Sequence, residues 1–313
     1  MPDLNSFDGL NNDNIDWLIG RLSRQEYVRL LGFNPFPWQD AILNSKSKHI
    51  VINAARQGGK STITAADPCW IAKYMEKSLA IVIAPTEEQS KEDIDKIKAF
   101  IALDGTYPPH RPSETHIFLD NKSKIKVKIA RQTARGASKP ELVILDEASQ
   151  IEDNIYSEVV LPMFTDNPEG REILLSTPYG KRGFFYDVFT NREPDDPWER
   201  FEIRSPWEPV ETEHGLDLVL FMGGNEKAYQ ELRAREGIKA WFSPRHSNYA
   251  QQRHFLSRMG IRKYRQEFCC EFVETEDTVF SYNDIKAAFE QQKDDEIIDF
   301  SVAVDEQIEV LQL

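Results

Sequence analysis

A short apolar segment, a glycine turn and a helix start follow one another in His49-Ile-Val-Ile-Asn-Ala54-Ala-Arg-Gln-Gly-Gly59-Lys60-Ser61. This stretch approximates the phosphate-binding loop G-x-x-x-x-G-K-[ST], with Ala54 in place of the first glycine. Gly58 and Gly59 allow the main chain to wrap around a phosphate so that several N–H groups point inward. The positive N-terminal end of the following helix adds to the attraction. The alternative is a glycine turn that only joins a strand to a helix.

Two carboxylates end a second apolar segment, Glu141-Leu-Val-Ile-Leu-Asp146-Glu147. Asp146, at the carboxyl end of a buried strand, is suited to hold Mg²⁺ through water, and the Ser61 hydroxyl is a further ligand. Lys60 then reaches the β- and γ-phosphates, and Glu147 polarises a water for in-line attack on the γ-phosphate. Two adjacent acids also occur in ordinary solvated turns. With Lys60 upstream, the two motifs together predict a nucleotide hydrolase.

Two more segments fit a nucleotide site, each with a structural alternative. Phe33-Asn-Pro35-Phe-Pro-Trp38-Gln39 offers an aromatic wall and an amide able to pair with the edge of adenine, or it is a core-packing turn. Ser176-Thr177-Pro178 follows the apolar segment 173–175. Its hydroxyls either sense the γ-phosphate or cap the following helix.

Strand and helix patterns alternate along the first two thirds of the chain. Continuous apolar segments predict strands buried on both faces of a parallel sheet, at 49–53, 79–84, 142–145 and 173–175. Residues 61–75 and 87–100 predict helices between them, and this alternation implies an α/β fold. A loose helical spacing covers residues 13–31, and residues 225–265 are largely helical and basic.

A strand with one basic face is predicted at residues 122–131, where lysines alternate with Ile125, Val127 and Ile129. Seven bases lie between Lys122 and Lys139 with no acid among them. Such a face is suited to contact the phosphates of DNA. The alternative is that the lysines protect an exposed strand edge from aggregation.

The overall acidity of the chain is concentrated at its end. The net charge is −14, but residues 266–313 hold fourteen acids and two bases, so residues 1–265 carry only −2 of it. A polyanionic partner is therefore not excluded. No apolar run reaches the ~18 residues of a membrane helix, and the N-terminus has no basic secretory region. The three cysteines form neither a disulfide framework nor a zinc-ligand spacing. We expect a soluble protein of a reducing compartment.

Several segments of the sequence together resemble one protein family. They are Ala55-Arg56-Gln57-Gly58-Gly59-Lys60-Ser61-Thr62, Ile144-Leu-Asp146-Glu147-Ala148, Leu175-Ser176-Thr177-Pro178-Tyr-Gly180-Lys-Arg-Gly183-Phe-Phe-Tyr186, Lys263-Tyr-Arg-Gln-Glu-Phe-Cys-Cys-Glu-Phe-Val273 and Thr278-Val-Phe-Ser281. In this order, from about residue 33 to residue 290, the chain resembles the ATPase half of the large terminase subunit of tailed double-stranded DNA bacteriophages.

The resemblance implies a RecA-like P-loop NTPase fold, a three-layer α/β/α arrangement with a mainly parallel sheet, plus a small, mostly helical lid subdomain. We expect an N-terminal helical segment at 1–32, the ATPase core at 33–205, the lid at 206–275 and an acidic linker or tail at 276–313. The family's usual nuclease half does not fit in the residues after Val273. This tail is the start of a missing nuclease domain or a natural end, and no DNA cleavage is expected from this chain.

By the same resemblance, ATP and Mg²⁺ are the ligands. Trp38 and Gln39 would hold adenine, and Ser61 and Asp146 would bind Mg²⁺. The residues around the phosphates would be Arg56, Gln57, Gly58, Gly59, Lys60, Ser61, Thr62 and Thr177. Lys60 and Glu147 would be catalytic. The family also supplies an arginine finger to a neighbouring subunit, for which Arg135 is the candidate and Arg56, acting in cis, the competitor.

The implied activity is an ATP-driven motor that moves double-stranded viral DNA into procapsids. Its partners would be DNA, the portal protein, the small terminase subunit and further copies of the chain in a pentameric ring. It would act in the host cytoplasm, transiently at the procapsid portal, and be absent from the mature virion. The alternatives are a helicase-like nucleic-acid-dependent ATPase and a nucleotide-binding structural or adaptor protein without turnover.

Overall fold

A mixed sheet forms the centre of the chain in the computed structural model, which describes residues 12–105, 113–134 and 139–274. Within these residues the sheet has eight strands in the order β10-β7-β1-β6-β5-β2-β4-β3. They are β1 (His49–Ala54), β2 (Leu79–Ala84), β3 (His116–Phe118), β4 (Lys124–Ile129), β5 (Leu142–Asp146), β6 (Arg171–Ser176), β7 (Trp198–Arg204) and β10 (Ile238–Phe242). All neighbouring strands are parallel except β3 and β4.

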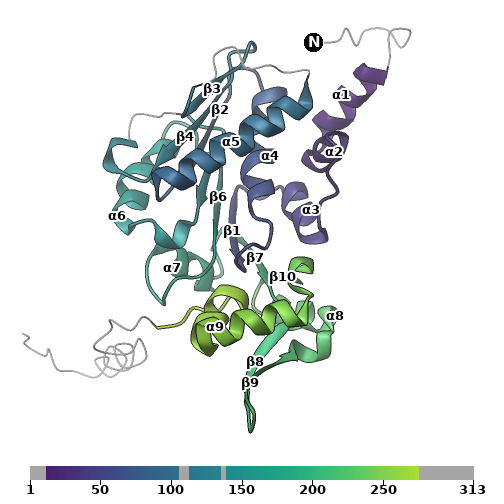
Figure 1. The fold of residues 1–313 in the computed structure, drawn as a ribbon. Helices are drawn as coiled ribbons and strands as arrows, with labels where there is room; N and C mark the ends of the chain where they lie inside the picture. The colour runs from purple at the N-terminus through teal and green to yellow at the C-terminus, as the bar shows by residue number, and fades with distance from the viewer. Residues whose placement is uncertain (1–11, 106–112, 135–138, 275–313) are drawn as a thin grey trace, which may run out of the picture. The chain divides into compact units, whose positions relative to one another are not determined.

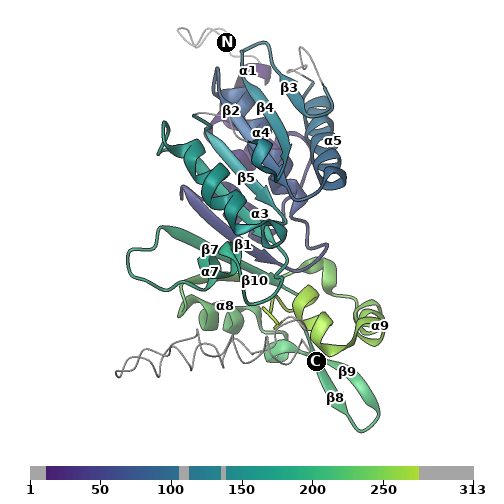
Figure 2. The same ribbon diagram turned by 90° about the vertical axis from the view of Figure 1, so that its left-hand side faces the viewer.

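Helices cover both faces of the sheet, because successive side chains of each strand point to opposite faces. Ile50 and Ile52 pack with α3 (Pro37–Asn44), α4 (Ser61–Tyr74) and α5 (Glu87–Asp104). Val51 packs on the other side with the helical turns of residues 153–164 and with α7 (Phe184–Thr190). Figures 1 and 2 show the sheet between these two layers. The expected three-layer α/β/α fold is confirmed.

The apolar segments were reliable guides to this architecture. The strands expected at 49–53, 79–84, 142–145 and 173–175 correspond to β1, β2, β5 and β6, and the helices expected after the first two are α4 and α5. The N-terminal helical pattern is divided into α1 (Asn12–Leu22) and α2 (Arg24–Leu30), since the Ser23 side chain caps the second helix.

Three strands of the sheet, β3, β7 and β10, were not indicated by the sequence pattern. In β7, Arg200, Glu202 and Arg204 alternate with apolar residues, which suggests a half-exposed strand, yet all three are buried. Arg200 pairs with Asp196, and Glu202 accepts hydrogen bonds from Tyr229 and Arg233. The buried charges are thus paired, which lets this strand lie inside the fold.

Residues 206–273 combine helices with strands. They include the hairpin of β8 (Trp207–Thr212) and β9 (Gly215–Leu220), α8 (Glu226–Ala234), β10 of the central sheet and α9 (Tyr249–Phe268). Leu218, Leu256, Tyr264 and Phe268 form a small core between the hairpin and α9. The chain up to Val273 is one compact unit. The proposed boundaries at residues 33, 206 and 276 stay predictions.

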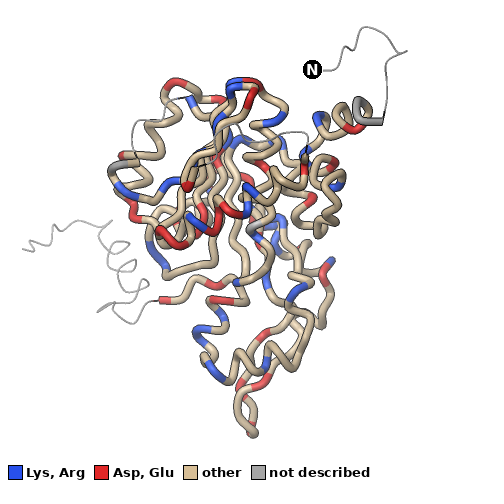
Figure 3. The backbone as a smooth tube through the Cα atoms, turned by 45° about the horizontal axis from the view of Figure 1, so that its top comes forward, with Lys and Arg blue, Asp and Glu red and all other residues tan. Residues whose placement is uncertain are grey.

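The basic face of β4 follows the expected alternation, with Ile125 and Val127 buried and Lys124 exposed. Because β3 pairs with the segment from Lys124 to Lys126, this part of β4 is not the edge of the sheet, so edge protection does not explain these two lysines. Figure 3 shows basic and acidic residues interspersed along the described chain. Among the described residues, none of the helices combines the length and apolar character needed to cross a membrane.

Candidate active site

The glycine turn after β1 has the strained backbone that its sequence predicts. Gly59 has a φ of 107°, a conformation that side chains other than glycine's rarely tolerate. A Cβ atom on Gly58 would lie 2.9 Å from the carbonyl oxygen of Ala55. Gln57 also has a positive φ, 57°. The turn therefore depends on both glycines, and α4 begins immediately after Lys60.

Three strand ends meet at this turn, because β6 pairs with both β1 and β5. Lys60, which is only 9% exposed, follows β1, and its Nζ donates a hydrogen bond to Thr177 Oγ1 at 2.9 Å. The same Nζ lies 3.5 Å from Glu147 Oε1. The structure thus brings together Lys60, Thr177 and Glu147, which come from three separate segments of the chain.

Glu147 is held in a fixed orientation against the end of β6. Its φ of 47° is unusual for a residue with a side chain, and such backbone strain is typical of functional sites. Glu147 Oε2 accepts hydrogen bonds from Ser176 Oγ at 3.2 Å and from the Thr177 main-chain N–H at 3.4 Å. Ser149 Oγ lies 2.7 Å from Ser176 Oγ. The next helix begins only at Phe184, so the hydroxyls of residues 176 and 177 do not cap it.

Asp146 lies buried beside Glu147 at the end of β5. Burial, and then the Glu147 charge, raise the pKa of the Asp146 carboxyl, while Lys60 and Lys96 oppose that shift. A carboxylate in such a place is destabilised unless a cation accompanies it. Asp146 is therefore chemically suited to a site for Mg²⁺, which prefers carboxylate oxygens.

A third carboxylate, Asp93 of α5, belongs to the same site and was not identified from the sequence. It is 1% exposed, and burial, followed by the Asp146 charge, raises its pKa. A signal was present, because Asp93 lies four residues before Ile97 and eight before Ile101, on the apolar face of the helix. An acid on the buried face of an amphipathic helix is uncommon and indicates a special environment.

These groups line two adjoining cavities at the carboxyl ends of the strands. The first, of about 320 Å³, is lined by the turn residues 56–60, by Asp93, Asp146 and Glu147, and by Arg245. The second, of about 430 Å³, is lined by Arg56, Glu147, Thr177 and residues 263, 266 and 267. Ligand sites of parallel α/β sheets lie at this edge.

Residues near the end of the compact unit hold the main chain of the glycine turn. The Arg56 N–H donates to the Glu267 carbonyl at 2.7 Å, and His246 Nε2 lies 2.9 Å from the Arg56 carbonyl oxygen. The Asn53 side chain donates to the Cys270 carbonyl at 2.9 Å. Burial lowers the pKa of His246 to about 4, so its ring is neutral at physiological pH and Nε2–H is the donor. No sequence motif pointed to His246.

Trp38 and Gln39 lie on the buried side of the glycine turn, next to Gly59. Trp38 is 1% exposed and belongs to the core. Gln39 Nε2 donates to the Gly59 carbonyl at 2.9 Å, and its Oε1 accepts from the Phe36 N–H at 2.8 Å. Both the oxygen and the nitrogen of the Gln39 amide thus form hydrogen bonds within the protein. The contact of Trp38 and Gln39 with adenine stays a prediction.

The remaining predicted residues are only partly located. Thr62 lies in the first turn of α4, and its N–H is 3.4 Å from the Gly59 carbonyl oxygen. Ser61 begins α4, but its side chain lies outside the described part of the chain, as does the whole of Arg135. The Arg56 side chain is 65% exposed, with Nη1 3.4 Å from Glu267 Oε2.

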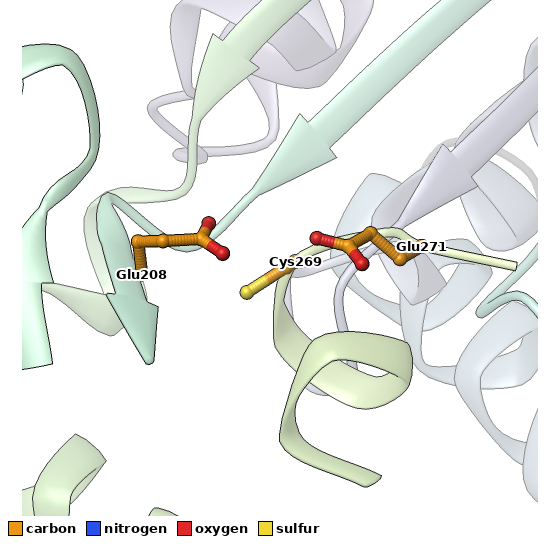
Figure 4. Close-up of side chains that lie close together, drawn as sticks. All are labelled: Glu208, Cys269 and Glu271. Atoms are coloured by element: carbon orange, nitrogen blue, oxygen red, sulfur yellow. The ribbon is translucent and has the colours of Figure 1, made fainter. Parts of the chain in front are cut away.

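A separate group of possible metal ligands lies beside β8, where Glu208, Cys269 and Glu271 approach one another (Figure 4). Glu208 pairs with Arg204 and lies 3.6 Å from Arg265. Burial raises the pKa of the Cys269 thiol, whose Sγ lies 3.5 Å from the Trp207 carbonyl oxygen. Glu208 is therefore already paired with arginines, which weakens its attraction for a cation.

A phosphate-binding turn after β1, an acid pair after β5 and a strand between them define a P-loop nucleotide-binding protein of the α/β class. A family model described as "Terminase large subunit, T4likevirus-type, N-terminal" matches residues 51–287. The chain belongs to this family, as the sequence motifs indicated.

Individual relatives agree with this assignment. The chain is 22% identical over 278 residues to the large terminase subunit of Thermus phage G20c and 24% identical over 277 residues to that of Thermus virus P23-45. Each match covers 82% of this chain and 52% of the relative, so the chain spans about half the length of the curated relatives it matches.

Solved structures show the same fold. The large terminase ATPase domain of Thermus phage P74-26 matches with a TM-score of 0.56 and 20% identity, over 79% of this chain and 98% of that one. The large terminase of bacteriophage HK97 matches with a TM-score of 0.51 and 14% identity, over 75% of this chain and 50% of that one.

Proposed function

We propose that this chain hydrolyses ATP and uses the energy to move double-stranded DNA during viral genome packaging. The observation that carries the proposal is the contact of Lys60 with both Thr177 and Glu147 beside a phosphate-binding turn, in a member of the large terminase family. A P74-26 relative with the same fold is described as a large terminase ATPase domain, which supports the reaction.

Each side chain has a defined part in the reaction. The N–H groups of the turn and Lys60 bind the β- and γ-phosphates, and Lys60 exchanges its contact with Thr177 for the phosphate oxygens. Glu147 orients a water and accepts its proton as the water oxygen attacks the γ-phosphorus. The bond from this phosphorus to the bridging oxygen breaks, and ADP and phosphate form.

Asp146, with the Ser61 hydroxyl, would hold Mg²⁺. The fit is supported by the burial of the Asp146 carboxylate, which needs a neighbouring positive charge. When bound, the ion supplies positive charge that offsets the negative charge on the β- and γ-phosphates. Arg135 of a neighbouring subunit would stabilise the charge on the transferring group, with Arg56 as the competitor in cis.

The wider assembly is part of the same proposal. We infer a pentameric ring that engages the portal protein and the small terminase subunit, in the host cytoplasm and transiently at the procapsid portal, outside the mature virion. The basic stretch from Lys122 to Lys139, which includes Lys124 and Lys126 of β4, is one candidate surface for the DNA backbone, and the basic residues of 225–265 are another. The domain boundaries and the expectation that this chain does not cleave DNA stay predictions.

The steady-state ATPase rate per subunit, measured against protein concentration with and without double-stranded DNA, tests the proposal. A rate that rises with concentration and with DNA is expected, because an arginine supplied in trans completes the site only between subunits. A substantial rate independent of concentration would instead support Arg56 in cis and weaken the ring. ATP binding without turnover under every condition would support the adaptor alternative, and unwinding of a forked duplex the helicase one.

A further inference from the structure

Asp93 is a buried charge for which the fold itself provides little compensation. Its carboxylate is 1% exposed, and neither oxygen has a hydrogen-bond partner among the described residues. The nearest cation is Lys96 Nζ, 3.6 Å from Asp93 Oδ1, and that ammonium group also lies 3.5 Å from Glu92 Oε2. Because a buried carboxylate without hydrogen bonds is destabilising, its presence needs a reason other than folding.

The position of Asp93 suggests that reason. Asp93 lines the 320 Å³ cavity together with Gly59, Lys60 and Asp146. It reaches the cavity from α5, whereas Asp146 reaches it from β5, so two elements of the fold each direct one carboxylate to the same space. The two charges repel each other, and a cation bound between them would relieve that repulsion.

We propose that Asp93 is a second carboxylate of the metal–nucleotide site, which helps Asp146 to retain the divalent cation that accompanies ATP. This inference rests on the proposed function, because it needs nucleotide to bind at the glycine turn. Asp93 is a positioning residue, since it acts through the cation rather than on the reacting atoms. A structural ion pair with Lys96 is the competing explanation.

The two explanations predict different effects of removing the Asp93 charge on the affinity for nucleotide. Without a metal ion, the charge of Asp93 repels the phosphates of ATP, so its removal should tighten metal-free binding or leave it unchanged. With the metal ion, the same charge attracts the cation, so its removal should weaken binding. Loss of a merely structural ion pair would lower both affinities together, because the turn itself would be disturbed.

The matched variants are Asp93→Asn and Asp95→Asn, two substitutions in the same helix that remove one charge each. The Asp95 side chain is 74% exposed and pairs with Lys98 at 3.7 Å, outside the cavity. The affinity for a non-hydrolysable ATP analogue is measured with Mg²⁺ and with a chelator. Mn²⁺ binding to the protein–analogue complex is measured by electron paramagnetic resonance. The thermal unfolding temperature of each ligand-free variant is measured as well.

For Asp93→Asn we expect Mn²⁺ to bind about 10-fold more weakly, metal-free analogue to bind at least as tightly as in the wild type, and the unfolding temperature to be equal or higher. Asp95→Asn should match the wild type. Unchanged Mn²⁺ affinity in Asp93→Asn, or a parallel loss of both nucleotide affinities, would overturn the inference. Asp93→Ser, which also removes the charge, repeats the test if the Asn variant does not fold.

The experiment distinguishes a failure of the proposed function from a failure of the proposed role of Asp93. If the wild-type protein binds no ATP analogue with Mg²⁺ present, the proposed function is wrong. If the wild type binds it in a metal-promoted manner and Asp93→Asn retains the same promotion, only the role of Asp93 is wrong.

Discussion

Nζ of Lys60 lies 2.9 Å from Oγ1 of Thr177, although 117 residues separate them in the sequence. The lysine charge is thus already held at the cavity by a hydroxyl and by Glu147, 3.5 Å away. A cation oriented before its ligand arrives loses less conformational freedom on binding. If the site binds phosphate as proposed, Lys60 is preorganised to meet it.

Glu147→Gln should retain ATP binding and lose turnover by at least about 100-fold, because glutamine keeps the shape of the side chain but cannot accept a proton. Lys60→Ala should instead lose ATP binding itself, since it removes the charge that faces the phosphates. Calorimetric binding and steady-state hydrolysis, measured on both variants, separate the two effects. Unchanged turnover in Glu147→Gln would rule out the proposed mechanism.

Gly59→Ala should lose ATP binding and destabilise the fold by about 1 kcal/mol, because its φ of 107° is unfavourable for alanine. Gly105→Ala is the matched control, since Gly105 also has a positive φ, 62°, with open space around its Cα, but it ends α5 away from the cavities. Both variants should unfold at lower denaturant concentration. Loss of nucleotide binding in the Gly105 variant as well would show that the effect is not specific to the turn.

His246 should contribute less to the stability of the protein as the pH falls from 7 to 5. Its pKa is about 4 in the folded protein and about 6.5 in an unfolded chain, so the unfolded state binds the proton first. The contribution of His246 to the unfolding free energy is complete above pH 6.5 and falls by about 2 kcal/mol at pH 5.

Denaturant unfolding of wild type and His246→Gln at both pH values checks this prediction. The variant lacks the titrating ring, so between pH 7 and pH 5 the wild type should lose about 2 kcal/mol of unfolding free energy relative to the variant. Buried carboxyls such as Asp93 change stability in the opposite sense in both proteins, so the comparison isolates His246. An equal pH dependence in the two proteins would contradict the assignment.

Arg135→Ala subunits mixed with Glu147→Gln subunits should recover part of the ATPase activity that each lacks alone. A mixed interface can combine an intact Glu147 from one subunit with an intact Arg135 from its neighbour. The measurement is hydrolysis as a function of mixing ratio, with assembly of mixed complexes demonstrated independently. No recovery in assembled mixtures would place the arginine in cis.

The sequence predicted those features that short segments encode on their own. The apolar segments of β1 and β5 identify buried parallel strands, and the motifs around Lys60 and Asp146 lie at the carboxyl ends of these strands, where the structure brings them to one cavity. Strand β7 was missed because pairing in three dimensions, as between Arg200 and Asp196, allows charged residues to be buried. Asp93 was missed for a related reason, since its environment depends on how α5 packs against β2 and β4 and so brings Asp93 near Asp146.

The glycine turn is held by residues that are synthesised much later in the chain. Asn53 and Arg56 find hydrogen-bond partners in Cys270 and Glu267, 217 and 211 residues later. A growing chain emerges from the ribosome N-terminus first. The turn is therefore among the first parts to be made and among the last to be completed, since a nascent chain that ends before residue 267 carries every nucleotide motif but lacks these contacts.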